Sequence, residues 1–217
     1  MYNLTSICFG DKYIPIKTHW EKRVKEVCKK LKNIYIWDES SDLQIPNNVY
    51  AFWDCIRLKK NIDLLTKEDT PVVHCDMDII IKHDIGDIVE LPYDLIISTE
   101  IGGNTSFPTE CSNKLGFGMC TGFHILKKST LPFILEIYEN MINSKYHSYS
   151  DQVTLMNHIT SSEYKVYEET CKINEVSFKN RIIEIDNIKI CVLDFEMIDR
   201  DPMVTKNQIA MHINIDN

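Results

Sequence analysis

The sequence contains no long run of apolar residues. No segment approaches the roughly 18 consecutive apolar residues of a membrane-spanning helix. The N-terminus also lacks the basic region followed by an apolar core that marks a secretory signal. These absences predict a protein without a membrane span or signal peptide that works in the cytoplasm, alone or as the N-terminal domain of a longer protein.

Basic residues do not gather in blocks either. The formal net charge is −8, and no cluster of lysine and arginine opposes this acidic balance. Such a chain is not expected to bind nucleic acid in general. An anionic substrate would need a metal ion or a few well-placed basic side chains.

Cysteines never form a Cys-x-x-Cys pair, although the chain contains eight of them. Scattered cysteines in apolar or helical surroundings predict reduced, partly buried thiols rather than disulfides or a zinc site.

Internal repeats, low-complexity tracts and a dividing linker are also absent from the sequence. The 217 residues, 44% hydrophobic and 26% charged, suit a single globular domain.

What is present is an alternation of strand and helix patterns. Short apolar runs bounded by turn residues predict strands at 4–9, 34–37, 71–75, 94–99, 119–126, 188–193 and 209–215. Amphipathic and apolar patterns predict helices at 15–32, 49–65, 131–142 and 151–159. The polar segments 40–48 and 101–116 are expected to be loops. This order predicts an α/β fold with a mixed, mostly parallel central sheet flanked by helices on both faces.

The strongest local signal is Asp76-Met77-Asp78, with Val72-Val73 before it and three isoleucines after it. If the strand continued through this pair, Asp76 and Asp78 would point the same way. Two carboxylates so placed repel each other unless a cation lies between them. The pattern therefore predicts a divalent metal site at the C-terminal edge of a sheet, where open α/β folds bind ligands. The alternative is a pair of surface acids at a strand end.

Other motifs accompany the acidic pair in a definite order. An N-terminal strand comes first, and a helix with Arg57 and Lys60 precedes the Asp-x-Asp pair. After the pair come Cys-Thr-Gly-Phe at 120–123, Ser-Asp-Gln at 150–152 and Met-His at 211–212. In this order the motifs resemble the GT-A class of nucleotide-sugar glycosyltransferases, which often have Asn-Thr-Gly-Phe at the first of these later positions. The resemblance extends over most of the chain and is to the small transferases of bacteria and large DNA viruses.

The resemblance implies a metal-dependent transfer of sugar from a nucleoside-diphosphate sugar, UDP-linked rather than GDP-linked, to a glycan or other hydroxyl acceptor. Asp76 and Asp78 would bind Mn²⁺ or Mg²⁺, and His212 would be a third ligand that favours Mn²⁺. A partly buried strand histidine is the alternative for His212. His74 is expected to pack in the core or to support the acidic pair.

The same resemblance assigns further residues to the donor site. Arg57, or Lys60, would meet the diphosphate or sugar, although both could also be solvated charges on the helix. The remaining positions expected near the nucleotide or sugar are Thr5, Phe9, Tyr13, Met77, Thr121, Gly122 and Gln152. Asp151 would lie near the reacting carbon, or would instead cap its helix. The late histidine and the Asp-Gln helix favour retention of anomeric configuration. For an inverting enzyme, Asp151, Asp84 and Glu100 are all candidate bases.

Two other functions fit parts of the pattern. Haloacid-dehalogenase-like phosphatases also carry Asp-x-Asp after an apolar strand, but in them the pair lies at the first strand of the core. Here two strand–helix units precede it. The other alternative is a catalytically inactive nucleotide-binding module.

Overall fold

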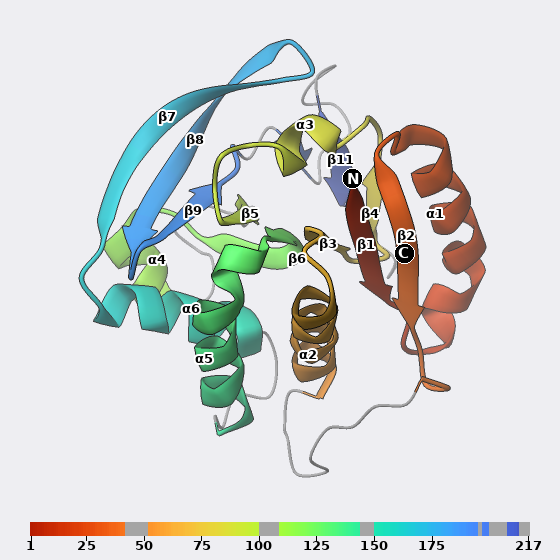
Figure 1. The fold of residues 1–217 in the computed structure, drawn as a ribbon, viewed down its shortest axis with the longest axis horizontal. Coiled ribbons are helices and arrows are strands. Elements are labelled where there is room, and N and C mark those ends of the chain that lie inside the picture. Colours follow the sequence, from red (N-terminus) through yellow and green to blue (C-terminus); the bar gives the residue numbers. More distant parts are fainter. Residues whose placement is uncertain (42–51, 100–108, 144–149, 195–196, 200–207, 213–217) are drawn as a thin grey trace.

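The computed structural model describes residues 1–41, 52–99, 109–143, 150–194, 197–199 and 208–212 (Figure 1). Its centre is an eight-stranded sheet in the order β2-β1-β3-β6-β5-β9-β8-β7. In chain order these strands are β1 (Tyr2–Ile7), β2 (Leu31–Trp37), β3 (Val72–Cys75), β5 (Leu95–Thr99), β6 (Met119–Leu126), β7 (Lys165–Ile173), β8 (Val176–Ile185) and β9 (Ile188–Val192). A smaller sheet joins β10 (Ile198–Asp199), β11 (Ala210–His212) and β4 (Ile79–Ile81).

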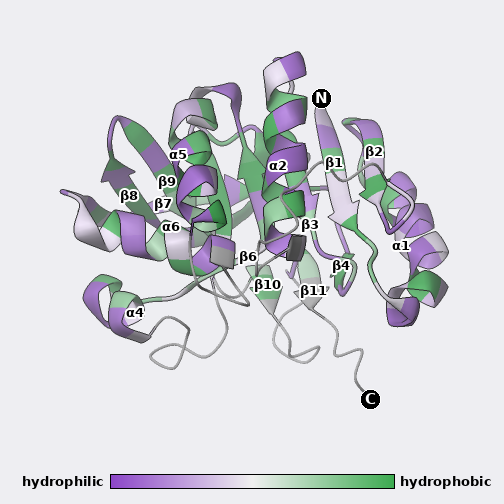
Figure 2. Ribbon diagram, turned by 90° about the horizontal axis from the view of Figure 1, so that it is seen from below, coloured by the Kyte–Doolittle hydropathy of each residue, from purple (hydrophilic) through white to green (hydrophobic). Residues whose placement is uncertain are grey.

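Helices cover both faces of the large sheet (Figures 1 and 2). They are α1 (Ile14–Val27), α2 (Phe52–Lys67), α3 (Gly86–Val89), α4 (Thr109–Leu115), α5 (Leu131–Ile142) and α6 (Ser150–Ser161). Short 3₁₀ turns at Asp11–Tyr13 and Lys128–Thr130 lead into α1 and α5. Among the described helices, none is both long and apolar enough to cross a membrane.

Strand alternation divides the interior into two cores. On β3, Val73 and Cys75 pack in the core that contains Trp20 of α1. Val72 points the other way, into the core that contains Leu65 of α2. His74 has the same parity as Val72, so alternation places it on the α2 face of the sheet.

The α/β class and the flanking helices are confirmed, but the sheet is less parallel than expected. The parallel pairings are β1–β2, β1–β3 and β5–β9, whereas β3–β6, β5–β6, β7–β8 and β8–β9 are antiparallel. An apolar run predicts a buried strand without fixing its direction, because direction depends on the neighbour with which it pairs.

Several predicted elements match closely, notably α5 and β6, and others need correction. The first helix ends at Val27 rather than at 32, because Cys28 is extended and β2 already begins at Leu31. The expected loop at 101–116 contains α4, while 101–108 lie outside the described residues. Segment 49–51 and the end of the 209–215 strand also lie outside them.

The hairpin formed by β7 and β8 was not anticipated. Its turn residues, Asn174 and Glu175, both have positive φ angles, 48° and 69°. Two-residue hairpin turns of this kind are most readily recognised when glycine occupies the second position. Glutamate at that position removes the usual sequence signal.

Candidate functional site

The acidic pair lies in a turn between β3 and β4. The backbone N–H of Asp76 donates to the carbonyl of Gly122 on β6 at 2.8 Å, which extends the β3–β6 ladder by one residue. The N–H of Ile79 then donates to the carbonyl of Asp76 at 3.0 Å and closes the turn. Strand alternation therefore does not continue through Asp78, contrary to the expectation. Asp76 and Asp78 are half-buried, while Met77 is 2% exposed and packs in the core.

Asp76 is held by basic groups from two elements. Nη1 of Arg57 lies 3.2 Å from Oδ1 and 3.4 Å from Oδ2 of Asp76, and Nε2 of His74 lies 2.8 Å from Oδ1. Burial alone would raise the pKa of Asp76, but the Arg57 charge and the His74 hydrogen bond lower it to about 2. The Asp76 side chain is therefore an anion throughout the neutral range.

Arg57 is the central cation of this cluster and is 5% exposed. Its Nη2 donates to Asp54 at 3.3 Å, to the Thr121 hydroxyl at 3.1 Å, and to Asp151. Burial favours loss of its proton, but the carboxylates of Asp151, Asp76 and Asp54 outweigh burial and raise its pKa. One positive charge thus contacts three carboxylates, so these four side chains together carry net negative charge, and Asp78 follows two residues after Asp76.

Asp151 lies in the first turn of α6, as a capping residue would, but its contacts reach across the protein. Its Oδ1 accepts the backbone N–H of Gln152 at 2.8 Å and the hydroxyl of Thr121 at 3.0 Å. Its Oδ2 accepts from Arg57. Asp151 is 4% exposed and Gln152, the next residue on α6, is 3% exposed; of the two, it is the Asp151 side chain whose contacts join the Arg57 cluster.

Aromatic side chains lie just after β1, just before α1 and at the start of α2. Phe9 stacks on Trp53, the second residue of α2, with ring centroids 3.9 Å apart and planes 26° apart. Trp53 is 44% exposed. Tyr13 is half-buried, and its pKa is raised by burial and then by the negative charge of Asp78. Trp53 was missed from the sequence, because a tryptophan in a helical pattern reads as a core residue.

The position expected for Thr5 needs correction. Its side chain is 0% exposed and is bonded inside the protein to Asn61 and His74, so in this structure it offers no surface to a base or ribose. The Met77 side chain is buried in the core and, like that of Thr5, offers no surface to a nucleotide or sugar. Lys60 lies one turn after Arg57 on α2 and is half-buried.

His212 is placed only through its backbone. It lies on β11, which pairs antiparallel with β4, and its register partner is Ile79, the residue after Asp78. Its side chain lies outside the described part of the structure. Within the side chains that are described, no group of three His, Cys, Asp or Glu residues is arranged to hold a metal.

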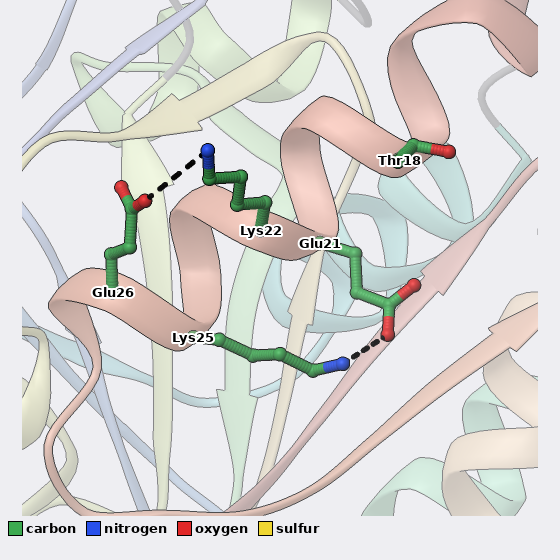
Figure 3. Close-up of a pocket in the computed structure, with 5 residues that line it drawn as sticks. All are labelled: Thr18, Glu21, Lys22, Lys25 and Glu26. Carbon is green, nitrogen blue, oxygen red and sulfur yellow. Dashed lines mark hydrogen bonds and ion pairs between the residues drawn. The ribbon is translucent and has the colours of Figure 1, made fainter.

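A surface hollow lies away from this cluster, on the exposed side of α1 (Figure 3). The residues that line it all come from that helix: Thr18, Glu21, Lys22, Lys25 and Glu26. Lys25 pairs with Glu21 at 2.6 Å and Lys22 with Glu26 at 4.0 Å, each one turn apart. These are ordinary ion pairs of a solvated helix face, and the hollow has no catalytic group of its own.

No protein-family model matches the chain, and no curated protein matches it in sequence. Solved structures do match. A glycosyltransferase involved in the glycosylation of the major capsid of PBCV-1 has a TM-score of 0.61 at 14% identity, covering 97% of this chain and 92% of that one. The galactosyltransferase LgtC, in complex with donor and acceptor sugar analogs, has a TM-score of 0.53 at 11% identity, covering 97% and 86%.

Mouse xyloside xylosyltransferase 1 has a TM-score of 0.55 at 9% identity, covering 98% of this chain and 97% of that one. At these identities the similarity establishes the fold. The chain has the GT-A fold that its motifs predicted, and its Asp-x-Asp turn follows the third strand in chain order. The fold gives no support to the phosphatase alternative.

Proposed function

We propose that this protein is a metal-dependent glycosyltransferase that moves a sugar from a nucleoside-diphosphate sugar to a hydroxyl group of a glycan or other acceptor. The observation that carries the proposal is the Asp76–Asp78 turn, placed against Arg57 and Asp151 in a fold shared with several glycosyltransferases. We favour a UDP-linked donor and retention of anomeric configuration, as the motif resemblance implies.

The residues fit a divalent cation. Asp76 and Asp78 supply carboxylate oxygens, and the excess negative charge around Arg57 calls for a further cation. Oxygen ligands suit Mg²⁺ or Mn²⁺, and an imidazole nitrogen from His212, whose backbone runs beside Ile79, would favour Mn²⁺. A cation held there would supply positive charge to offset that of the departing nucleoside diphosphate.

The chain's own groups have distinct tasks in this proposal. The Arg57 charge helps to lower the pKa of Asp76, and its guanidinium bonds hold the carboxylates of Asp76 and Asp151 in place. Gly122 leaves room for the Asp76 carboxylate. Asp151 is our candidate for the carboxylate nearest the reacting carbon. Because Arg57 and Thr121 occupy its oxygens, it acts on a sugar only after those bonds rearrange.

The aromatic groups that follow β1 and begin α2 are our candidates for the nucleobase end of the donor site. Phe9, Tyr13 and Trp53 offer ring faces on which a nucleobase can stack.

A thermal-shift panel tests the proposal. Nucleoside diphosphates and nucleotide sugars are titrated with and without Mn²⁺, because a ligand that binds the native state raises the melting temperature. We expect UDP and one or more UDP-sugars to stabilise the protein only with Mn²⁺, and Asp78→Asn to abolish that shift. The proposal fails if no nucleotide shifts the melting temperature in the presence of metal.

Turnover distinguishes the alternatives. Wild-type protein should hydrolyse or transfer from a nucleotide sugar, with the product anomer read by NMR, and should release no phosphate from simple esters. A phosphatase would do the reverse. A binding module would show the thermal shift without any turnover.

A further inference from the structure

A row of buried polar side chains crosses the sheet behind Asp76. Thr5 on β1, His74 on β3 and His124 on β6 are register partners in neighbouring strands, and Asn61 of α2 covers them. Their exposed fractions are 0% for Thr5, His74 and Asn61 and 4% for His124. Polar groups in the middle of a sheet are costly unless they are hydrogen-bonded, so this row needs an explanation that packing alone does not supply.

His74 connects the row to the acidic turn. Its Nε2 lies 2.8 Å from Oδ1 of Asp76, and its Nδ1 lies 3.1 Å from the hydroxyl of Thr5. An ionised carboxylate only accepts hydrogen bonds, so Nε2 carries a proton and donates it toward Asp76. The imidazole is thus bonded at both ends, to a strand on one side and to the site on the other.

The other members hold the His74 ring in this orientation. Nδ1 of His124 faces the carbonyl of Thr121 at 2.8 Å and therefore donates to it, and Nε2 of His124 accepts from the Asn61 amide at 3.2 Å. This fixes the Asn61 oxygen toward Thr5, at 2.9 Å from its hydroxyl. The Thr5 hydroxyl can donate to Asn61 Oδ1, to the Val73 carbonyl at 3.3 Å or to His74 Nδ1, and in each arrangement His74 keeps its Nε2 proton for Asp76.

The two histidine rings also restrict each other. They stack with centroids 5.1 Å apart and planes 24° apart. Since rotation of His74 would break its bonds to Thr5 and Asp76 and the stacking with His124, the ring has one orientation available to it.

The geometry points to His74 as a positioning residue of the metal site, a role that rests on the proposed function. We propose that its Nε2–H anchors Oδ1 of Asp76, together with Nη1 of Arg57, and so fixes the direction of the carboxylate. Oδ2 is the oxygen beside Gly122, and among the described residues it receives only the longer Arg57 contact, at 3.4 Å. With Oδ1 anchored, Oδ2 is left to face a cation. Hydrogen-bond partners of metal-ligating side chains commonly orient their ligands in this way.

A pair of amide variants separates positioning from core filling. Gln places its amide nitrogen near the position of Nε2, so His74→Gln keeps a donor for Asp76. Asn places its amide near the position of Nδ1, so His74→Asn keeps a partner for Thr5 and loses the bond to Asp76. Both variants leave a polar amide in the row, and a role confined to packing predicts no such difference between them in metal affinity.

The experiment measures the affinity for Mn²⁺ without nucleotide. Mn²⁺ is titrated into metal-free protein, and the EPR signal reports the concentration of Mn²⁺ that remains unbound. We expect His74→Asn to weaken the affinity by about tenfold or more, the usual effect of losing a partner behind a metal ligand. His74→Gln should stay within about threefold of wild type. In turnover, His74→Asn should raise the KM for Mn²⁺, with kcat recovered at saturating metal. His158→Asn serves as the control, since it removes a half-buried imidazole that packs against Phe133 and does not belong to the row; it should lower the melting temperature but not the Mn²⁺ affinity.

Equal Mn²⁺ affinities for wild type and His74→Asn would overturn the inference and leave the proposed function intact. Equal losses in His74→Asn and His74→Gln would overturn it as well. If wild type binds no Mn²⁺, the metal site of the proposed function fails, and this inference fails with it. Should His74→Asn not fold, Thr5→Val replaces it: loss of the hydroxyl should weaken Mn²⁺ binding while Thr5→Ser does not, and equal affinities would again reject the role.

Discussion

Gly122 and Asp76 touch through both backbone and side chain. The Gly122 carbonyl accepts the Asp76 N–H at 2.8 Å, and a Cβ atom on Gly122 would lie 2.8 Å from Oδ2 of Asp76. Real Cβ atoms do not approach other atoms so closely. The carboxylate therefore occupies space that exists only because residue 122 has no side chain, which explains in physical terms why glycine follows Thr121 here.

Gly122→Ala should displace the Asp76 carboxylate. Arg57 and His74 resist that movement, so we expect weaker Mn²⁺-dependent nucleotide binding, measured by thermal shift, and a lower kcat/KM. Gly116→Ala is the matched control. Gly116 has φ +79° with open space around it, so alanine there should cost about 1–2 kcal/mol of stability through backbone strain. Unchanged nucleotide binding in Gly122→Ala would contradict the steric argument.

Arg57→Met should destabilise the protein strongly. Removing one partner of a buried ion pair leaves uncompensated charge, here on Asp76 and Asp151, and typically costs about 3–5 kcal/mol. Urea denaturation measures the loss. Adding Asp151→Asn should recover part of it, because one stranded charge disappears. Lys25→Met, which breaks an exposed pair with Glu21, should change stability by less than about 1 kcal/mol; comparable losses at both positions would refute the assignment.

Asp38, at the end of β2, should contribute to acid sensitivity. Its carboxylate accepts from the Ser40 hydroxyl at 2.6 Å and from Lys17 at 3.0 Å. These contacts lower its pKa from 3.8 to about 2. A lowered pKa in the folded state stabilises the protein above the ordinary pKa, and this contribution is lost as the pH falls from about 4 to 2.

Asp38→Asn removes the titrating group and should flatten that part of the stability curve. The difference between wild type and variant, measured by denaturation at each pH, should be about 1 kcal/mol or less at pH 7 because the pair is near the surface. It should shrink as the pH falls through about 2 and approach zero below that pH. Lys17→Met should reduce the same difference. A gap between wild type and Asp38→Asn that persists unchanged to pH 2 would show that charge is not its cause.

Trp53→Ala should weaken nucleotide binding with little loss of stability, since the side chain is 44% exposed. Base stacking on an aromatic group contributes about 1–3 kcal/mol by alanine substitution in nucleic-acid sites, so a loss of roughly tenfold in affinity for the nucleoside diphosphate is expected. Calorimetry with Mn²⁺ present measures it. Trp53→Phe retains a ring face and should retain most of the affinity. Equal affinity in wild type and Trp53→Ala would place the base elsewhere.

The sequence was informative where chemistry and periodicity coincide. Asp76 and Asp78 after an apolar strand identified the acidic site, and the apolar pattern of α5 gave its bounds, because burying one face of a helix imposes a spacing that can be read directly. The sequence did not predict the β7–β8 hairpin, because its turn lacks the usual glycine. It did not predict α4 either, because a short polar helix gains most of its stability from packing.

The roles within the site divide in the same way. The sequence by itself predicted an α/β fold and named the acidic pair, Arg57 and the Asp-Gln helix as site candidates. Residue types and apolar spacing are local patterns that can be read along the chain. Only the tertiary structure decided that Arg57 is shared by Asp54, Asp76 and Asp151, that Thr5 lies inside, and that His74 bonds Asp76. Those contacts join residues up to 94 positions apart. They follow from strand order and register, which no local pattern encodes.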